Sequence, residues 1–446
     1  MKINQAGYSL PKSPRIACKL LLLAIGLQIC LPAFGDADDS TKPCPIQADL
    51  WVLGGQSNMC YLGYRSAELY DRLPEPVSLD PRRVALFGLD NEWTEPHEPA
   101  HWFFHAKAPI YSETYRGHRP DLNDEEFERI RQAKRPHMEY AIGPGTAFAR
   151  HIIQHTDQNI GLIPCALGGV SMGMWDPALK DKGDNSLYGA TMNRIRMVGG
   201  RIKGILWNQG ESDSTFPSAT HYKATMLNFI DSIRRDTGQP DLPILFVQLG
   251  RTYARNPETL AAVLGIETVR EAQRTIALER ENAFVICTMD VPFEQGGHVS
   301  VAGQEMIGRR MAEVALTEVY QVPGHGRSVN LESVRVTTDK GLLPGSPIIH
   351  LHFSGVTGRL QTPGNGRPPD FELRLTTPPA TGDPTAIRTD FDPDDPASVI
   401  VRVEGHLTPT TRLYYGGGLI PYCNLIDDAG ILVPAFGPIE LPDKEP

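Results

Sequence analysis

The sequence predicts an α/β protein built on a parallel sheet and followed by a smaller all-β domain. Apolar strand-like runs alternate with helix-like segments from residue 47 to about residue 318, and helical periodicity ends after Val322-Pro323-Gly324. Alternation of this kind is typical of a parallel sheet with helices on both faces. A chain of 446 residues also exceeds what one hydrophobic core usually holds, so two domains are expected.

Five apolar runs have the length and composition of buried strands: 48–54, 159–167, 202–207, 242–249 and 283–289. Segments with helical spacing of apolar residues follow them, at 145–155, 185–198, 219–235, 257–279 and 301–316. Residues 60–140 form a long connection rich in proline, arginine and aromatic residues. A connection of that length is usually functional or partly structured, and this one is expected to form a wall of the substrate site.

The C-terminal part has a different pattern. Residues 325–446 contain short alternating runs separated by Gly, Pro and Asp, at 333–336, 348–353, 371–375, 399–403 and 411–415. This pattern predicts a β-domain with a sandwich-like arrangement.

Residues 1–35 have the features of a secretory signal peptide. Lys12, Arg15 and Lys19 precede an apolar run, residues 20–34, that is too short to span a bilayer comfortably. Cleavage after Gly35 would leave a catalytic domain over 36–322 and a secreted or periplasmic protein with no membrane association. Removing Lys2 and these three basic residues, with no acidic ones, changes the formal charge from −10 to −14. That charge argues against a nucleic-acid partner.

Five cysteines remain after the predicted cleavage: Cys44, Cys60, Cys165, Cys287 and Cys423. Their odd number and wide spacing argue against a disulfide scaffold and against a zinc site. One disulfide is compatible with this set, and Cys44 with Cys60 is the candidate pair.

Two short segments have the residue types that acyl transfer needs. Gly55-Gln56-Ser57-Asn58-Met59 directly follows the first predicted strand, and Gly297-His298-Val299-Ser300 precedes the last predicted helix. A serine hydroxyl is a weak nucleophile until a base removes its proton, and histidine does so near neutral pH. Glycines before the serine let the backbone turn sharply and leave N–H groups free for an oxyanion.

Ser171 is a rival nucleophile. Residues 169–173 match the G-x-S-x-G motif and follow a predicted strand, which makes an α/β-hydrolase-type esterase the alternative fold. That motif should open a helix, but Pro177 resists a continuing helix. Ser57 is therefore favoured, and Ser171 is expected on the wall of the substrate pocket.

Residues 97–101 match H-E-x-x-H, with His105 four residues later. Zinc binding through this motif needs a continuous helix. Pro96 and Pro99 lie within or beside the motif, and a proline inside a helix costs about 3 kcal/mol. We therefore expect a proline-rich loop that packs through its aromatic residues rather than a metal site.

Several segments, in order, resemble the SGNH hydrolases, and more specifically the branch of sialate O-acetylesterases and acetylxylan-esterase-like proteins. The resemblance spans most of residues 47–446. It rests on five blocks and a C-terminal segment: Gly54-Gly55-Gln56-Ser57-Asn58-Met59, Gly143-Pro144-Gly145, Ala166-Leu167-Gly168-Gly169 leading to Trp175, Trp207-Asn208-Gln209-Gly210-Glu211-Ser212-Asp213, His298 before Gly303 and Gly308, and Tyr414-Tyr415 with Pro421-Tyr422-Cys423-Asn424-Leu425.

The resemblance implies a flavodoxin-like five-stranded sheet and a serine acetylesterase that acts on carbohydrates without a metal or another cofactor. Ser57 would be the nucleophile and His298 the base. The oxyanion hole would use the backbone N–H groups of Ser57 and Gly169 and the side-chain amide of Gln209. Asn208, next to Gln209, is the other amide that this block offers.

One position departs from the family pattern. The family usually has an aspartate three residues before the histidine, where this chain has Gln295. A carboxylate fixes the tautomer of the base and stabilises the imidazolium by its negative charge. A glutamine could orient the ring, but it supplies no charge. Glu294 is the favoured substitute, and Asp290 lies further back. The same departure motivates the alternative of a non-catalytic glycan-binding protein on this scaffold.

Overall fold

The computed structural model describes residues 41–60, 79–132, 142–252, 260–293, 298–369, 371–376 and 384–443. The predicted signal peptide and the candidate residues Glu294 and Gln295 lie outside this set. None of the helices in the described ranges combines the length and apolarity needed to cross a lipid bilayer.

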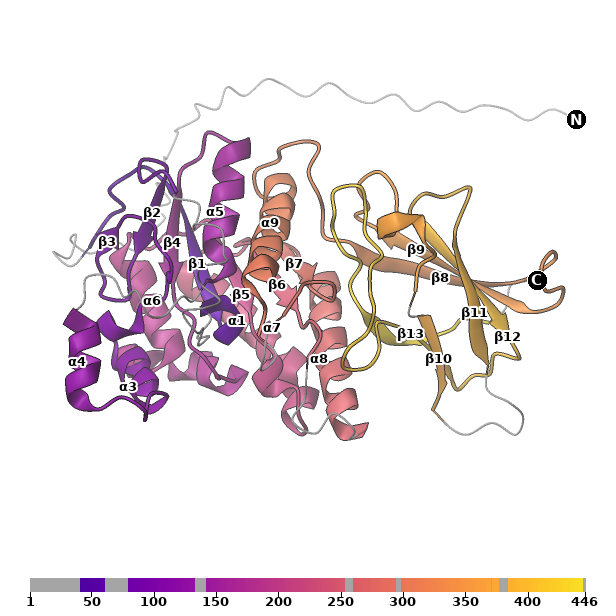
Figure 1. The fold of residues 1–446 in the computed structure, drawn as a ribbon, viewed down its shortest axis with the longest axis horizontal. Coiled ribbons are helices and arrows are strands. Elements are labelled where there is room, and N and C mark those ends of the chain that lie inside the picture. Colours follow the sequence, from indigo (N-terminus) through magenta and orange to yellow (C-terminus); the bar gives the residue numbers. More distant parts are fainter. Residues whose placement is uncertain are drawn as a thin grey trace, which may run out of the picture. The chain divides into compact units, whose positions relative to one another are not determined.

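Within the described residues, seven strands form one sheet in the order β3-β2-β4-β1-β5-β6-β7 (Figure 1). Neighbouring strands are parallel, except that β3 is antiparallel to β2. The strands are β1 (Asp49–Gly55), β2 (Val84–Phe87), β3 (Trp93–Thr94), β4 (Ile160–Pro164), β5 (Gly204–Asn208), β6 (Ile244–Gln248) and β7 (Ala283–Cys287).

Each of the five predicted strands is present, but the prediction of a five-stranded sheet was wrong. Numbered along the chain, the five predicted strands lie in the spatial order 2-1-3-4-5, which is the flavodoxin-like order. The two extra strands, β2 and β3, come from the long connection. They are two to four residues long in a proline-rich region, so their pattern is too short to stand out in the sequence.

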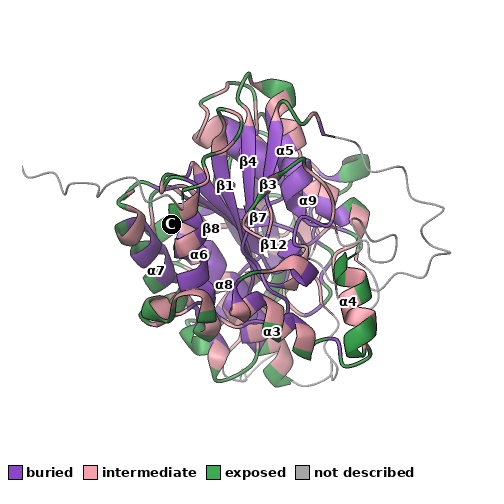
Figure 2. Ribbon diagram, turned by 90° about the vertical axis from the view of Figure 1, so that its left-hand side faces the viewer, coloured by how far each residue is buried: buried purple, intermediate pink, exposed green. Residues whose placement is uncertain are grey.

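The helices of this part are α1 (Ser57–Cys60), α3 (Pro109–Gly117), α4 (Asp124–Gln132), α5 (Pro144–His155), α6 (Leu187–Met197), α7 (Ser218–Thr237), α8 (Leu260–Glu279) and α9 (Val301–Glu318). Short 3-10 helices occupy Phe103–His105, Met172–Trp175, Pro177–Asn185 and Glu211–Asp213. Helices α5 and α9 pack against each other, and so do α7 and α8. Figure 2 shows buried strands between helices whose outer faces are exposed.

Two tryptophans fix how the helices cover the sheet. Trp51 of β1 lies beside Gly204 of β5 and packs against Phe148 of α5, with 4.8 Å between ring centroids. Trp207 lies beside Gly54 and packs against Phe229 of α7 at 4.5 Å. Because Trp51 and Gly54 are three residues apart in one strand, the two tryptophans point to opposite faces. Each large ring therefore uses the space that a glycine leaves on the neighbouring strand.

The C-terminal part contains two antiparallel sheets within the described residues, in the orders β11-β12-β9-β8 and β10-β13-β14. Their strands are β8 (Asn330–Thr338), β9 (Pro347–Ser354), β10 (Phe371–Leu375), β11 (Thr385–Phe391), β12 (Ser398–Glu404), β13 (Thr411–Tyr415) and β14 (Phe436–Glu440), with a 3-10 turn at Pro363–Asn365. Phe353 of one sheet and Phe436 of the other lie 6.3 Å apart. The sandwich-like arrangement and the domain boundary near residue 322 stay predictions.

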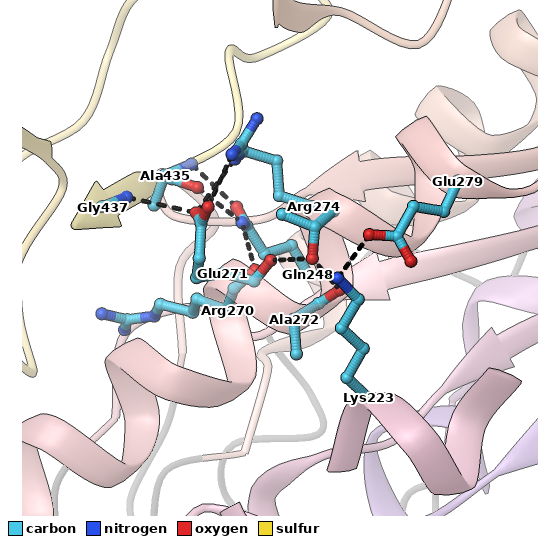
Figure 3. Close-up of polar contacts among 10 residues, drawn as sticks. Lys223, Gln248, Arg270, Glu271, Ala272, Arg274, Glu279, Ala435 and Gly437 are labelled. Atoms are coloured by element: carbon cyan, nitrogen blue, oxygen red, sulfur yellow. Dashed lines mark hydrogen bonds and ion pairs between the residues drawn. The ribbon is translucent and has the colours of Figure 1, made fainter. Parts of the chain in front are cut away.

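Polar groups join β6 and α8 to the C-terminal sheets (Figure 3). The side-chain amide of Gln248 bonds both the N–H and the carbonyl of Ala435 at 2.8 Å. The carboxylate of Glu271 accepts from the Gly437 N–H at 3.2 Å and pairs with Arg274. Arg270 is buried and donates to the Gly250 and Gly418 carbonyls. The end of β6 is thus bonded to the C-terminal part.

Cys44 and Cys60 do not form a disulfide with each other, so the candidate bridge between them was wrong. Cys60 is buried against its own helical turn, where its thiol donates to the Gln56 carbonyl at 3.6 Å. Burial raises the pKa of the Cys60 thiol.

Gly55 is the most constrained position of the turn before Ser57. Its φ is +125°, and an added Cβ would lie 2.1 Å from the Asn208 carbonyl oxygen. We expect Gly55→Ala to lower the free energy of unfolding by about 3 kcal/mol or more, because backbone strain adds to a clash with rigid backbone. Gly238→Ala is the control, because Gly238 has a φ of +66° and an added Cβ there would have no atom within 4 Å. This variant should lower the free energy of unfolding by about 1 kcal/mol. Urea unfolding of both variants measures the difference, and equal losses would refute this account.

Candidate active site

The predicted catalytic residues gather where two neighbouring strands end. β1 lies between β4 and β5, so the chain reverses its strand order at the β1/β5 pair, where ligands bind in such folds. Ser57 opens α1 two residues after β1, and Asn208 ends β5. The Gln56 N–H donates to the Asn208 carbonyl at 2.8 Å, and its side-chain oxygen accepts from the Ser212 N–H at 3.3 Å.

Asn58 connects the Ser57 turn to the His298 segment. Its Nδ2 donates to Glu211 Oε1 at 2.5 Å, and its Oδ1 accepts from the Val299 N–H at 3.1 Å. Its carbonyl accepts from Gln304 Nε2 at 3.0 Å and from Asn208 Nδ2 at 3.3 Å. Because Asn58 follows Ser57 and Val299 follows His298, one side chain holds the two predicted catalytic segments together. Sequence reasoning quoted Asn58 within its block but gave it no role.

His298 lies just before α9 in a half-buried position. Ser300 caps that helix, since its Oγ accepts from the Gly303 N–H at 3.2 Å. A β-bridge between Phe293 and Val299 joins the two ends of the segment that carries Glu294 and Gln295. Burial lowers the pKa of His298. The imidazole is therefore neutral near pH 7, as a general base requires.

Asp290 is already occupied by another partner. Its two carboxylate oxygens each accept from the Arg310 guanidinium at 2.6 Å. This bidentate pair ties the end of β7 to α9, so Asp290 serves as a structural anion in this arrangement.

Glu211 is a buried carboxyl that sequence reasoning assigned only a possible capping role. Burial raises its pKa, and Asn58 donates to its Oε1. Its Oε2 has no hydrogen-bond partner among the described residues. A buried carboxyl with a free oxygen beside the serine and histidine segments is a candidate for proton chemistry. Its place in the Asn208-Gln209-Gly210-Glu211 block was the available signal in the sequence.

Gln209, the predicted oxyanion donor, is fully buried and uses its amide elsewhere. Its Nε2 donates to the Val170 carbonyl at 3.1 Å and to Asp213 Oδ2 at 2.6 Å. Asp213 Oδ2 also accepts from the Met172 N–H at 2.8 Å. In this arrangement Gln209 and Asp213 hold the loop that carries Gly169, which is exposed.

Ser171 does not lie on a strand-to-helix turn. β4 ends at Pro164, and Ser171 has an extended backbone, with φ −89° and ψ 168°. A four-residue 3-10 helix follows, and Asp176 then begins a second 3-10 segment at Pro177. The prediction that Pro177 prevents a continuing α-helix is confirmed.

Residues 97–101 form a loop rather than a helix, as expected, and bond to Thr146 of α5 and to Ala166, which follows β4. Glu98 is bonded to Thr146 Oγ1 at 2.5 Å and to the Ala100 N–H at 3.0 Å, and burial raises its pKa to about 7. His101 Nε2 accepts from the Ala166 N–H at 3.2 Å, and burial lowers its pKa to about 3. Trp102 packs against Phe104 at 4.8 Å. These contacts use Glu98 and His101 of the motif to hold the loop.

A pocket of about 420 Å³ lies between the carboxyl ends of the strands and the C-terminal part. Arg251, Asp290 and Arg309 line it together with Tyr422 and Asn424. Arg251 also lines a cavity of about 20 Å³ next to Asn58, Glu211 and Val299, which has room for about one water molecule. A larger pocket of about 710 Å³ lies at the opposite strand ends, around Asp49 and Lys203, away from these residues.

Residues 47–317 match the family described as carbohydrate esterase, sialic acid-specific acetylesterase. The chain belongs to this family. The match covers more than half of the chain and includes both Ser57 and His298. The predicted resemblance to sialate O-acetylesterases is thereby confirmed, and the chain is a carbohydrate esterase of the acetylesterase type.

One curated relative and one solved structure are similar to this chain. A probable carbohydrate esterase from Arabidopsis thaliana is 26% identical over 298 residues, which is 63% of this chain and 95% of the relative. The crystal structure of a carbohydrate acetylesterase from Xanthomonas citri has a TM-score of 0.59 at 19% identity and covers 87% of this chain and 80% of its own. The second likeness supports the fold over both the α/β part and the C-terminal sheets.

Asn58→Ala tests whether Asn58 positions the catalytic segments. Removing its side chain breaks the bonds to Glu211 and to the Val299 N–H, so we expect kcat on an acetyl ester to fall about a hundredfold with a smaller change in KM. Asn193→Ala is the matched control. Asn193 lies on α6, and its side-chain amide also donates a hydrogen bond to a carboxylate, that of Asp184. Steady-state kinetics of both variants decide the matter. A similar loss in both would mean that Asn58 acts only through general stability.

Proposed function

We propose that this carbohydrate esterase removes acetyl groups from sugars by a serine–histidine mechanism of the sialate O-acetylesterase type. The observation that carries the proposal is the position of Asn58. This residue directly follows Ser57, and its side chain accepts a hydrogen bond from the backbone N–H of Val299, which directly follows His298. The proposed localisation is secreted or periplasmic, with residues 1–35 removed as a signal peptide. The proposed partner is an acetylated carbohydrate, with no role for nucleic acid or for a membrane.

In the proposed first step, Ser57 Oγ attacks the acetyl carbonyl carbon while His298 takes the hydroxyl proton. The tetrahedral intermediate then breaks its bond to the sugar oxygen, and the imidazolium returns the proton to that oxygen. The sugar leaves as an alcohol, and the acetyl group stays on Ser57. Water, deprotonated by His298, attacks this ester, and acetate leaves as Ser57 regains its proton.

The proposed oxyanion hole uses the N–H groups of Ser57 and Gly169 and the amide of Gln209. Gln209 supports this role in one of two ways. It can hold the Gly169 loop through its bonds to Val170 and Asp213, or it can exchange one of them for the oxyanion. Loss of one direct donor typically costs a hundredfold or more in rate.

The proposed partner of the His298 ring is Glu294, which lies in the segment between Phe293 and His298. Glu211 is the alternative, because its buried carboxyl shares Asn58 as a neighbour with the His298 segment. Gln295 could orient the ring without supplying charge. Asp290 is the least suited of these residues, since Arg310 occupies both of its oxygens.

The proposed sugar site is the pocket that joins Arg251 to the C-terminal segment around Tyr422. Tyr422 is 65% exposed and offers an aromatic ring for a sugar face. Arg251 and Arg309 place positive charge in the same pocket. This combination favours an acidic sugar, which fits a sialic acid-specific acetylesterase. The C-terminal part would then contribute to substrate binding.

Hydrolysis of 4-nitrophenyl acetate by the mature chain separates the two serines. We expect Ser57→Ala to lower kcat by about a thousandfold or more, because no other group forms the acyl-enzyme. Ser171→Ala should keep most of the activity. A loss confined to Ser171→Ala would overturn the site assignment. A parent protein that turns over neither this ester nor acetylated sugars would favour a glycan-binding protein.

The pH profile of the same reaction reports on His298. Its pKa is lowered by burial, and the base works only when neutral. Activity should therefore be complete at neutral pH and fall as the pH drops through the lowered pKa, with a kcat/KM inflection below about 6.5. Intrinsic tryptophan fluorescence at each pH serves as the control for unfolding. An inflection above 6.5 would show that a nearby negative charge outweighs burial.

A further inference from the structure

A second group of titratable residues lies apart from the catalytic segments, where α5, α9 and the segment before β8 meet. His151 Nε2 lies 2.6 Å from Glu313 Oε1, and His325 Nδ1 lies 2.9 Å from Glu313 Oε2. The Gly326 N–H also donates to Glu313 Oε2 at 3.1 Å. Side-chain exposure is 16% for His151, 12% for Glu313 and 14% for His325.

This cluster has the donor atoms of a transition-metal site. One ligand atom from each residue can be chosen so that all three lie within 4.8 Å of one another. Imidazole nitrogen and carboxylate oxygen both bind Zn²⁺, at about 2.0–2.2 Å. Tetrahedral coordination at those lengths places ligand atoms about 3.3 Å apart. The two nitrogen–oxygen pairs would therefore open slightly to admit an ion.

The charge and surroundings of the cluster fit a cation. Both imidazoles and the Gly326 N–H lie within hydrogen-bond distance of the Glu313 carboxylate, which is an anionic ligand of the type that Zn²⁺ binds. The His155 ring packs against the rings of His151 and His325 at 4.4 Å and 4.8 Å. His155 Nδ1 bonds the His151 carbonyl at 2.9 Å, which fixes its ring beside the other two.

The competing explanation is that these residues only form hydrogen bonds that hold the helices together. His352, elsewhere in the chain, is an example of a histidine that is hydrogen-bonded in this way. His352 lies between two carboxylates, 2.7 Å from Asp395 and 3.6 Å from Glu332. It brings one imidazole to two anions, whereas the other cluster brings two imidazoles to one carboxylate. The cluster of His151, Glu313 and His325 has more nitrogen atoms and fewer carboxylates than the His352 group. It therefore matches the preference of Zn²⁺ for nitrogen ligands better than a simple hydrogen-bonded contact between helices does.

We propose that His151, Glu313 and His325 form a binding site for a borderline divalent cation, with Zn²⁺ as the expected ion and water in the fourth position. On binding, each imidazole gives up the proton on the nitrogen that faces the ion: a neutral ring takes a proton from solvent on its other nitrogen instead, and a charged ring releases one proton to solvent. The cation replaces the two carboxylate–imidazole hydrogen bonds with coordinate bonds.

The site has a structural role and leaves the proposed hydrolysis free of metal. Glu313 lies 12 residues after the start of α9, which is about 18 Å along the helix from the end near His298. His325 lies between α9 and β8, and the neighbouring Gly326 N–H bonds the same carboxylate. A bound ion therefore fixes the connection between α9 and the C-terminal sheets to α5.

Zinc binding by the tag-free, chelator-treated mature protein tests the proposal. Competition with a chromophoric chelator should give one Zn²⁺ per chain, and Co²⁺ should give the visible absorption of a four-coordinate ion. We expect His151→Asn, Glu313→Gln and His325→Asn each to weaken binding by about tenfold or more. The matched control, His352→Asn, should bind as the parent does. Far-UV circular dichroism of each variant checks that it is folded.

Two results would overturn the site. One is a parent protein that takes up less than one equivalent of Zn²⁺ or gives no four-coordinate Co²⁺ spectrum. The other is a folded set of three variants that binds as tightly as His352→Asn. Because the parent spectrum is read on the unaltered chain, the test holds even where a variant fails to fold. Turnover of 4-nitrophenyl acetate should be the same with and without Zn²⁺, which keeps this test separate from that of the esterase mechanism.

Discussion

The buried polar contacts of Asn58 are the constraint on which the site depends. Its side chain and carbonyl reach residues that follow β5, precede α9 and lie within α9. Buried polar groups must be paired, because an unpaired one costs about 1–3 kcal/mol. The pairing of Asn58 therefore restricts three chain segments at once. Those segments include the neighbours of both Ser57 and His298, so the requirement to satisfy one amide also restricts where these two residues lie.

The surrounding polar groups extend this constraint across the carboxyl edge of the sheet. Gln209 and Asp213 hold the loop with Gly169 to the end of β5, and Gln248 with Arg270 holds the end of β6 to the C-terminal part. Burial lowers the pKa of Arg270 to about 10, yet carbonyl oxygens bond its guanidinium on several sides. A rigid strand edge of this kind suits a hydrolase, since pre-oriented groups lose little order when charge develops in the reaction.

The sequence predicted the sheet better than it predicted the contacts of the site. Each predicted strand of the sheet is an apolar run, and the family resemblance implied a flavodoxin-like sheet. Strands β2, β3, β11 and β14 were missed. β2 and β3 are only four and two residues long, β11 contains no buried residue, and β14 contains Pro438. Asn58 and Glu211 were quoted but not given their roles. Their importance depends on burial and on partners 153 and 241 residues away in the chain, which no local pattern encodes.

The histidine cluster shows how such distant placement works at the other end of α9. His151 and His155 are four residues apart in α5 and so share one face, a spacing that is visible in the sequence. Their relation to Glu313 and His325 depends on the packing of α5 against α9, which brings residues from three elements to one point. α9 thus carries polar contacts at both ends, to Asn58 near its first turn and to His151 near its last. These contacts oppose a shift of α9 at both of its ends. The helix directly follows the His298 segment and precedes the first strand of the C-terminal sheets, so its position affects both.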